Sequence, residues 1–169
     1  REDVKIDLLD CHRLELICDK SLVPELAYIF KHALIQEVAY NSLLLKRRKE
    51  IHERIGKAIE ELYPERLEEF YEMLAYHYSS GENWEKAYQY LWASAKKVAS
   101  RYSLWEAFRF GKEAIHALKK LPDTEENKRR GIEARLFMSW DMIALGYPEN
   151  SLDILQEGER LSRELGDEK

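Results

Sequence analysis

The sequence has few of the residues that break helices or cross-link a chain. Its 169 residues include two Cys, four Pro and seven Gly. Cys11 and Cys18 are spaced neither as a zinc knuckle nor as a redox pair, and no apolar segment suggests export. We therefore expect the reducing cytoplasm as the compartment. With 45% hydrophobic and 35% charged residues, the composition is that of a helix-rich soluble protein.

An excess of basic charge and long apolar runs are also missing. The formal net charge is -5, whereas a surface built for nucleic acid usually carries an excess of Lys and Arg, so nucleic acid is not the partner we expect. The apolar runs are far shorter than the roughly 20 residues that cross a bilayer, so we expect no membrane span. The chain starts with Arg1 rather than Met, and we expect it to be a piece of a longer protein.

Motifs for catalysis or metal binding are absent as well. Gly111-Lys112 lacks the preceding Gly and the following Ser or Thr of a phosphate-binding loop. The stretch Ile51-His52-Glu53-Arg54 begins like a zinc protease helix, but Gly56 stands where the second His ligand belongs. We therefore expect this chain by itself to be no enzyme and to hold no metal and no cofactor.

The first thirty residues have a strand-like pattern. "RLELICDKS" and "ELAYIFK" carry apolar, β-branched and aromatic residues over strand lengths, and Ser21 to Glu25, with Pro24, predicts the turn between them. They predict a two-stranded hairpin over residues 14–31. Val4 to Leu9 before it leaves room for the end of a short helix.

The remainder has the helical period. One apolar face is predicted from Leu34 to Leu62, through Val38, Leu43, Leu44, Ile51, Ile55, Ala58 and Ile59, and Pro64 ends it. Amphipathic helices are then expected at about 66–79, 84–101, 104–120, 128–145 and 148–165. In such a stack we expect the four Trp residues, at 84, 92, 105 and 140, to lie mostly in the core.

These helices carry a repeating pattern of small and large residues. A 34-residue tetratricopeptide repeat has its interface residues where this chain has Leu74, Ala75, Tyr78, Ala87 and Leu91. Ala107 with Ala114, and Gly146 with Ser151, mark two further copies. A small residue at a helix crossing lets two backbones approach, and a large neighbour fills the adjacent hole. Helix 84–101 fits either as the second helix of one pair or as the first of the next. The expected fold is mainly α, a superhelix of helix hairpins preceded by a small β-hairpin.

His32, in "FKHALIQEVAY", is the candidate site residue. If a strand ends near Phe30 and a helix starts at about His32, the imidazole stands beside free backbone N–H groups and the positive end of the helix dipole. A phosphate is a natural ligand there. The alternative is that His32 only has its hydrogen-bonding groups satisfied at a helix start and binds no ligand. The basic run Lys46 to Lys49 could likewise grip phosphates, or it is a solvated helix face.

Four stretches together resemble a known junction: a strand ending in "YIF", then "KHALIQEVAYNSLL", "RRKEIHERIGKAIEE" and "LAYHYSSGENWEKAYQYL". Over roughly residues 8 to 120 the chain resembles STAND signalling ATPases, above all those in multidomain regulators that carry a nucleotide cyclase or a DNA-binding domain. In that family a P-loop ATPase module precedes a winged helix and a helical-repeat superhelix. The resemblance implies that residues 1–44 are the C-terminal part of the winged helix and residues 45–169 the repeats.

The resemblance also implies a role for His32. Related nucleotide switches end the winged helix with Met-His-Asp-Leu, whose His contacts the β-phosphate of ADP in the off state. This chain matches at His32 and Leu34, whereas Ala33 replaces the Asp and Phe30-Lys31 does not reproduce the Met. ATP or ADP would be bound only in the parent protein. The implied function is a non-catalytic regulatory module whose partner is a protein, a small effector or the upstream ATPase domain of the same chain.

Two other functions remain open. A free-standing repeat adaptor that clamps a carboxylate needs Lys, Asn and Arg at set positions of each first helix. Depending on the repeat register, those positions hold Glu72 and Tyr76, Trp92 and Lys96, or Leu136 and Trp140. DNA binding would rest on the winged-helix resemblance and on Lys46 to Lys49. We expect both less than the regulatory module.

Overall fold

The computed structural model describes residues 2–21 and 27–166. Over these residues the protein is mainly helical, with a small antiparallel hairpin near the N-terminus, which confirms the coarse prediction. The chain divides into two compact units, residues 1–48 and 49–169. The assignment of residues 1–44 to a winged helix and 45–169 to repeats stays a prediction, because compactness does not identify a family.

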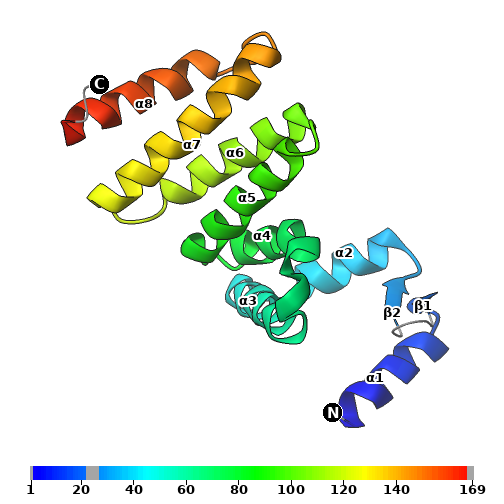
Figure 1. The fold of residues 1–169 in the computed structure, drawn as a ribbon. Coiled ribbons are helices and arrows are strands. Elements are labelled where there is room, and N and C mark those ends of the chain that lie inside the picture. The colour runs from blue at the N-terminus through cyan, green and yellow to red at the C-terminus, as the bar shows by residue number, and fades with distance from the viewer. Residues whose placement is uncertain (1, 22–26, 167–169) are drawn as a thin grey trace. The chain divides into compact units, whose positions relative to one another are not determined.

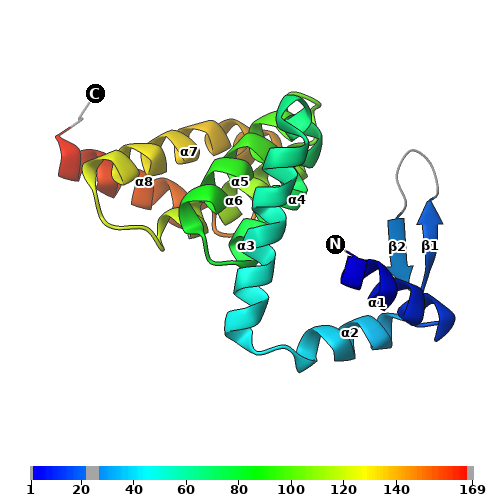
Figure 2. The ribbon, with the colours of Figure 1, turned by 90° about the horizontal axis from the view of Figure 1, so that it is seen from below.

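The first unit contains α1 (Glu2–Arg13), β1 (Ile17–Ser21), β2 (Ala27–Phe30) and α2 (Ala33–Ser42). The two strands lie side by side in Figure 2, with Ile17 opposite Phe30 and Asp19 opposite Tyr28. The pairing shifts register between Asp19 and Ser21. The hairpin is confirmed, while most of the predicted turn falls on residues 22–26, outside the described residues.

The helix before the hairpin is longer than predicted. It runs to Arg13 instead of ending near Leu9, and β1 starts only at Ile17. Glu15 ends the helix in the left-handed conformation (φ 56°), and the Leu16 N–H donates to the Cys11 carbonyl at 3.0 Å. Glycine usually occupies the left-handed position of this cap. Because a glutamate stands there instead, the sequence does not mark the end of this helix.

The single apolar face predicted from Leu34 to Leu62 is wrong, because two helices share this stretch. After α2, Leu43 takes an extended conformation, and α3 (Leu45–Leu62) begins. Arg48 donates from Nε to the Leu43 carbonyl and from Nη2 to the Asn41 carbonyl, each at 2.9 Å. These bonds satisfy carbonyls at the end of α2 and stabilise the break. Leu34 is accordingly exposed.

The second unit continues with a 3-10 segment, η1 (Pro64–Phe70), and with α4 (Tyr71–Ser80), α5 (Trp84–Ala99), α6 (Leu104–Leu118), α7 (Glu125–Ala144) and α8 (Ser151–Leu165). From α4 to α8, each helix packs against the next (Figure 1). The last four predicted helices are confirmed with small shifts of their ends. The helix predicted at 66–79 is partly wrong, because Arg66 is non-helical (φ -128°, ψ 22°) and the Tyr63 and Phe70 rings stack at 4.6 Å around this kink.

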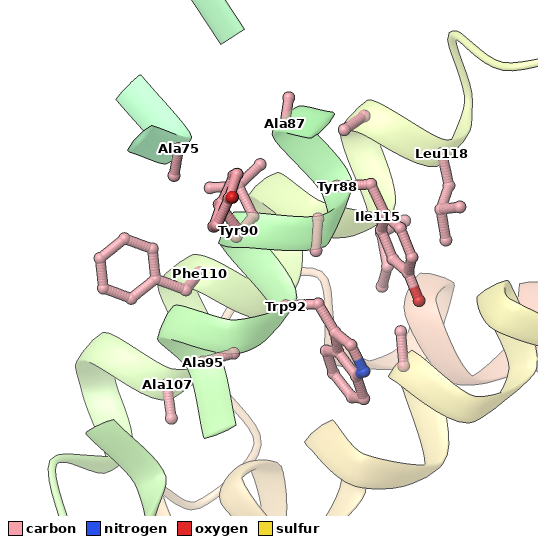
Figure 3. Close-up of a cluster of buried hydrophobic side chains, with 14 of the residues drawn as sticks. Ala75, Ala87, Tyr88, Tyr90, Trp92, Ala95, Ala107, Phe110, Ile115 and Leu118 are labelled. Atoms are coloured by element: carbon pink, nitrogen blue, oxygen red, sulfur yellow. The ribbon is translucent and has the colours of Figure 1, made fainter. Parts of the chain in front are cut away.

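Small residues lie where the helices cross. Figure 3 shows Ala87 and Ala95 of α5 and Ala107 of α6 among larger buried side chains, and all three are fully buried. At Gly111 of α6 a Cβ atom would lie 2.6 Å from the sulfur of Met138 on α7. The side chain of one helix therefore rests on the backbone of its neighbour. The first predicted repeat copy is buried throughout, at Leu74, Ala75, Tyr78, Ala87 and Leu91.

Candidate functional site

His32 is the N-cap of α2, in extended conformation (φ -132°, ψ 133°), as its position in the sequence predicted. Its carbonyl accepts from the Ile35 N–H at 3.1 Å. Its side chain is exposed and makes no capping hydrogen bond. Within residues 2–21 and 27–166, the N–H groups of Ala33 and Leu34 have no backbone acceptor. The start of α2 thus presents free donors beside an unengaged imidazole.

The start of α2 has no acidic residue of its own to offset the positive end of the helix dipole. The preceding Lys31 pairs with Glu15 at 2.5 Å, and its backbone N–H donates to the Leu16 carbonyl at 3.0 Å, which ties it to the turn before β1. An oxyanion could accept from the N–H groups and from His32 together. A binding site would need further donors from outside this stretch.

A second candidate site is a groove between α5 and α7. It has a volume of about 550 Å³ and is lined by Trp92, Lys96, Arg129, Ile132, Glu133, Leu136, Phe137 and Trp140. Trp92 is buried, and its ring meets the Phe137 ring edge-on at 4.9 Å. The rim of the groove exposes Leu136 at 65% and Trp140 at 77%. We call it the α5–α7 groove.

The α5–α7 groove brings together four residues that occupy the carboxylate-binding positions of an adaptor in two different repeat registers. Trp92 and Lys96 come from α5, and Leu136 and Trp140 come from α7. The prediction that the Trp residues lie mostly in the core is therefore wrong for Trp140, and also for Trp105 on α6, which is 62% exposed. Periodicity could not reveal this, because it does not say which apolar face a neighbouring helix covers.

The charges of the α5–α7 groove are mixed. The Lys96 ammonium stands 5.2 Å from the centroid of the Trp92 ring, and among the described residues no carboxylate lies within salt-bridge distance of it. Arg129 pairs with Glu125 at 3.0 Å on its own helix. The Lys96 ammonium could pair with a carboxylate of a partner, and the Trp92 ring beside it could contact an apolar side chain. The groove therefore suits a partner that offers an apolar side chain next to an acidic one.

The basic run at the start of α3 is engaged in part within the chain. Arg48 binds the carbonyls at the end of α2 and lies 4.7 Å from the centroid of the Tyr40 ring. Lys49 pairs with Glu82 at 2.6 Å. Lys46 is exposed. Arg48 and Lys49 are thus held by contacts within the chain, whereas Lys46 faces solvent.

A pair of histidines was not found by sequence reasoning. His52 of α3 and His77 of α4 approach with their Nδ1 atoms 2.9 Å apart, and the Tyr76 ring lies edge-on to both. One ring must donate and the other accept, so both cannot be protonated at Nδ1. Burial lowers the pKa of His52, while burial and then the charge of His52 lower the pKa of His77. Within the described ranges, no three His, Cys, Asp or Glu residues gather as metal ligands.

None of the helices in the described part of the chain is long and apolar enough to cross a membrane. Comparisons with protein-family models, with curated proteins and with solved structures found no match.

Proposed function

We propose that this chain is a non-catalytic regulatory module of a larger STAND-type signalling ATPase, in which the helical array receives an effector and the hairpin unit couples that event to a nucleotide switch. The α5–α7 groove carries the proposal. A large exposed apolar rim at Leu136 and Trp140 is costly to leave in water and is typical of an interaction surface. Aromatic residues are also the usual anchors of protein interfaces.

The coupling half of the proposal rests on His32. In the parent protein, the imidazole and the free N–H groups of α2 would contact the β-phosphate of ADP held by the upstream ATPase domain. A ligand shifts such a switch only through different contacts in its two states. The start of α2 is exposed and has no acidic residue in its first turn, which suits a contact that is made in one state and broken in the other.

The groove is tested by photo-crosslinking in cells. A photoreactive amino acid at position 136 of the full-length chain should give one discrete adduct, and Trp140→Ala in the same chain should abolish it. We expect the Trp140 truncation to cost about 2 kcal/mol of binding, roughly thirtyfold in affinity. The control position is Trp105, another exposed indole, on α6. Equal labelling from positions 136 and 105 would refute the groove as an interaction site. Mass spectrometry of the adduct shows whether the cross-linked partner is another protein or a second segment of the same chain.

The switch is tested by His32→Ala in the full-length protein. We expect faster ADP release and higher basal output, because one contact of the off state is lost. His116→Ala is the matched control, since His116 is also exposed but lies on α6. Unchanged ADP release and output would show that His32 has no such role. A coding sequence upstream that lacks a P-loop followed by an acidic metal-binding strand would remove the parent architecture as well.

The adaptor remains a second candidate, because the Lys96 ammonium over Trp92 could bind a carboxylate. A peptide with an acidic C-terminus should then bind the chain at about micromolar affinity or tighter and in a charge-dependent way. Lys96→Met should weaken that binding.

A further inference from the structure

A small cavity lies between α6, α7 and α8, separate from the α5–α7 groove. Its volume is about 250 Å³, below the roughly 300–1,000 Å³ that is typical of pockets for drug-sized ligands. Ile115, Leu118 and Leu161 supply apolar walls, and Lys119 and Arg135 supply cations. The cavity and the groove share no lining residue.

Arg135 is the unusual member of this cavity, because its residue is only 5% exposed. The alkyl stem lies over Gly158 of α8, where a Cβ atom would meet its Cδ at 3.1 Å. The guanidinium turns back to Gly131, where Nη1 donates to the carbonyl at 2.7 Å. A Cβ atom at Gly131 would lie 3.1 Å from Nη1 and 3.4 Å from Cδ1 of Leu161. Since Gly131 and Leu161 both line the cavity, the charged end of Arg135 lies at its wall.

The guanidinium has no counter-ion within the described residues. Its Nε is buried without a hydrogen-bond partner, and no carboxylate lies within salt-bridge distance. Glu157 acts on it only from farther away, because Arg160 holds both Glu157 oxygens at 2.8 Å. Burial lowers the pKa of Arg135. A buried charge without a partner costs several kcal/mol, and an arginine offers a planar edge that fits a carboxylate.

The other charges at the cavity do not satisfy Arg135. Lys128 is engaged by Glu164 at 3.0 Å and by Asp123 at 3.4 Å. Lys119 is exposed and adds positive charge. The site therefore has a surplus of cations next to apolar walls, and an anion would relieve the cost of burying Arg135.

We propose that this cavity binds a small carboxylate with an apolar body, whose carboxylate pairs with Arg135 and whose body contacts Ile115, Leu118 and Leu161. The size of the cavity restricts the ligand to a short aliphatic or single-ring acid. The site does not depend on the proposed signalling function, because none of its residues belongs to the α5–α7 groove or to the start of α2.

The probe is sodium hexanoate, titrated against the isotope-labelled chain and followed by NMR, with sodium chloride at equal ionic strength as the reference. The Gly131 amide and the Leu161 methyl groups should shift in a saturable way, with half-saturation at about 1 mM or below. Arg135→Met should weaken binding at least about tenfold. Arg129→Met, which removes an exposed arginine from the same helix, should leave it unchanged.

Arg135→Met is a fair test because a hydrophobic residue of similar length should keep the α7–α8 packing; circular dichroism checks the fold. Shifts that do not saturate, or that persist in Arg135→Met, would overturn the proposal. Sodium phosphate is the second probe. If phosphate binds as tightly as hexanoate, the apolar walls contribute nothing and the proposed ligand class is wrong. If Arg135→Met does not fold, absence of saturable shifts at Gly131 and Leu161 in the unmodified chain remains the refuting result.

Discussion

Replacing Glu60 by Gln should destabilise the second unit by about 2 kcal/mol. Glu60 of α3 joins three helices through one carboxylate. Its Oε2 accepts from the Tyr78 hydroxyl of α4 at 2.7 Å, and its Oε1 accepts from Lys86 of α5 at 2.8 Å and from the Tyr90 hydroxyl of the same helix. The Tyr78 and Tyr90 rings stack at 5.7 Å, so the carboxylate is a shared anchor for an aromatic pair.

The magnitude follows from the number and kind of these bonds. Hydrogen bonds to a charged group contribute about 1.5–3 kcal/mol each, and a buried hydroxyl left without a partner costs about 1–3 kcal/mol. Gln keeps one acceptor oxygen, but its amide group presents hydrogens to groups that are themselves donors. Tyr78 is fully buried, whereas Lys86 is partly exposed and can turn to water. The expected loss of stability is therefore smaller than the summed contributions of the three hydrogen bonds.

The assay is urea unfolding followed by far-ultraviolet circular dichroism. Glu61→Gln is the matched control, because Glu61 is the exposed next residue of the same helix. We expect its effect to stay within about 0.5 kcal/mol. Equal effects of the two variants would refute the anchoring role of Glu60.

The same hydrogen bonds to Glu60 should make the free energy of unfolding fall at acid pH. Burial alone would raise the pKa of Glu60, but hydrogen bonds from Lys86, Tyr90 and Tyr78 lower it below its ordinary value. The stabilisation is therefore present above the pKa of Glu60 in the unfolded chain and is lost as the pH falls through the lower pKa of the folded state. Unfolding of Glu60→Gln should depend less on pH in this range.

Three further predictions concern other contacts of the second unit. Gly56→Ala should destabilise it by about 1–3 kcal/mol despite the better helix propensity of alanine, because the new Cβ would lie 2.8 Å from the rigid ring of Tyr78; urea unfolding measures this. The pKa values of His52 and His77 are lowered by folding, so the free energy of unfolding should be highest above the pKa of histidine in the unfolded chain, about 6.5, and should fall as the pH falls below it. In a variant with Asn at both positions, the free energy of unfolding should depend less on pH between about pH 7 and pH 5. Tyr102→Gly should raise the melting temperature through about 1 kcal/mol of added stability, because Tyr102 is 90% exposed and strained at φ 60°; a lower melting temperature would contradict the strain.

The places where sequence reasoning failed have a common cause. The hairpin and the later helices follow from period and composition, but the end of α1 was misplaced because Glu15 takes the left-handed cap position that glycine usually occupies. The exposure of Trp140 was missed because a large aromatic residue at helical spacing has the same pattern whether or not a neighbour covers it. Local signals report the tendency of a segment, and they do not report which surface its neighbours leave open.

The sequence by itself determined that this chain builds helices with small residues at their crossings and a short hairpin before them, because apolar period and turn residues act over a few neighbouring positions. It also placed His32 at a helix start. Only the tertiary structure decided that His52 meets His77, that Trp92 and Trp140 line one groove, and that Arg135 is buried with no counter-ion among the residues that the structure describes. These contacts depend on the crossing angle and axial offset of packed helices, which the period of each helix leaves undetermined.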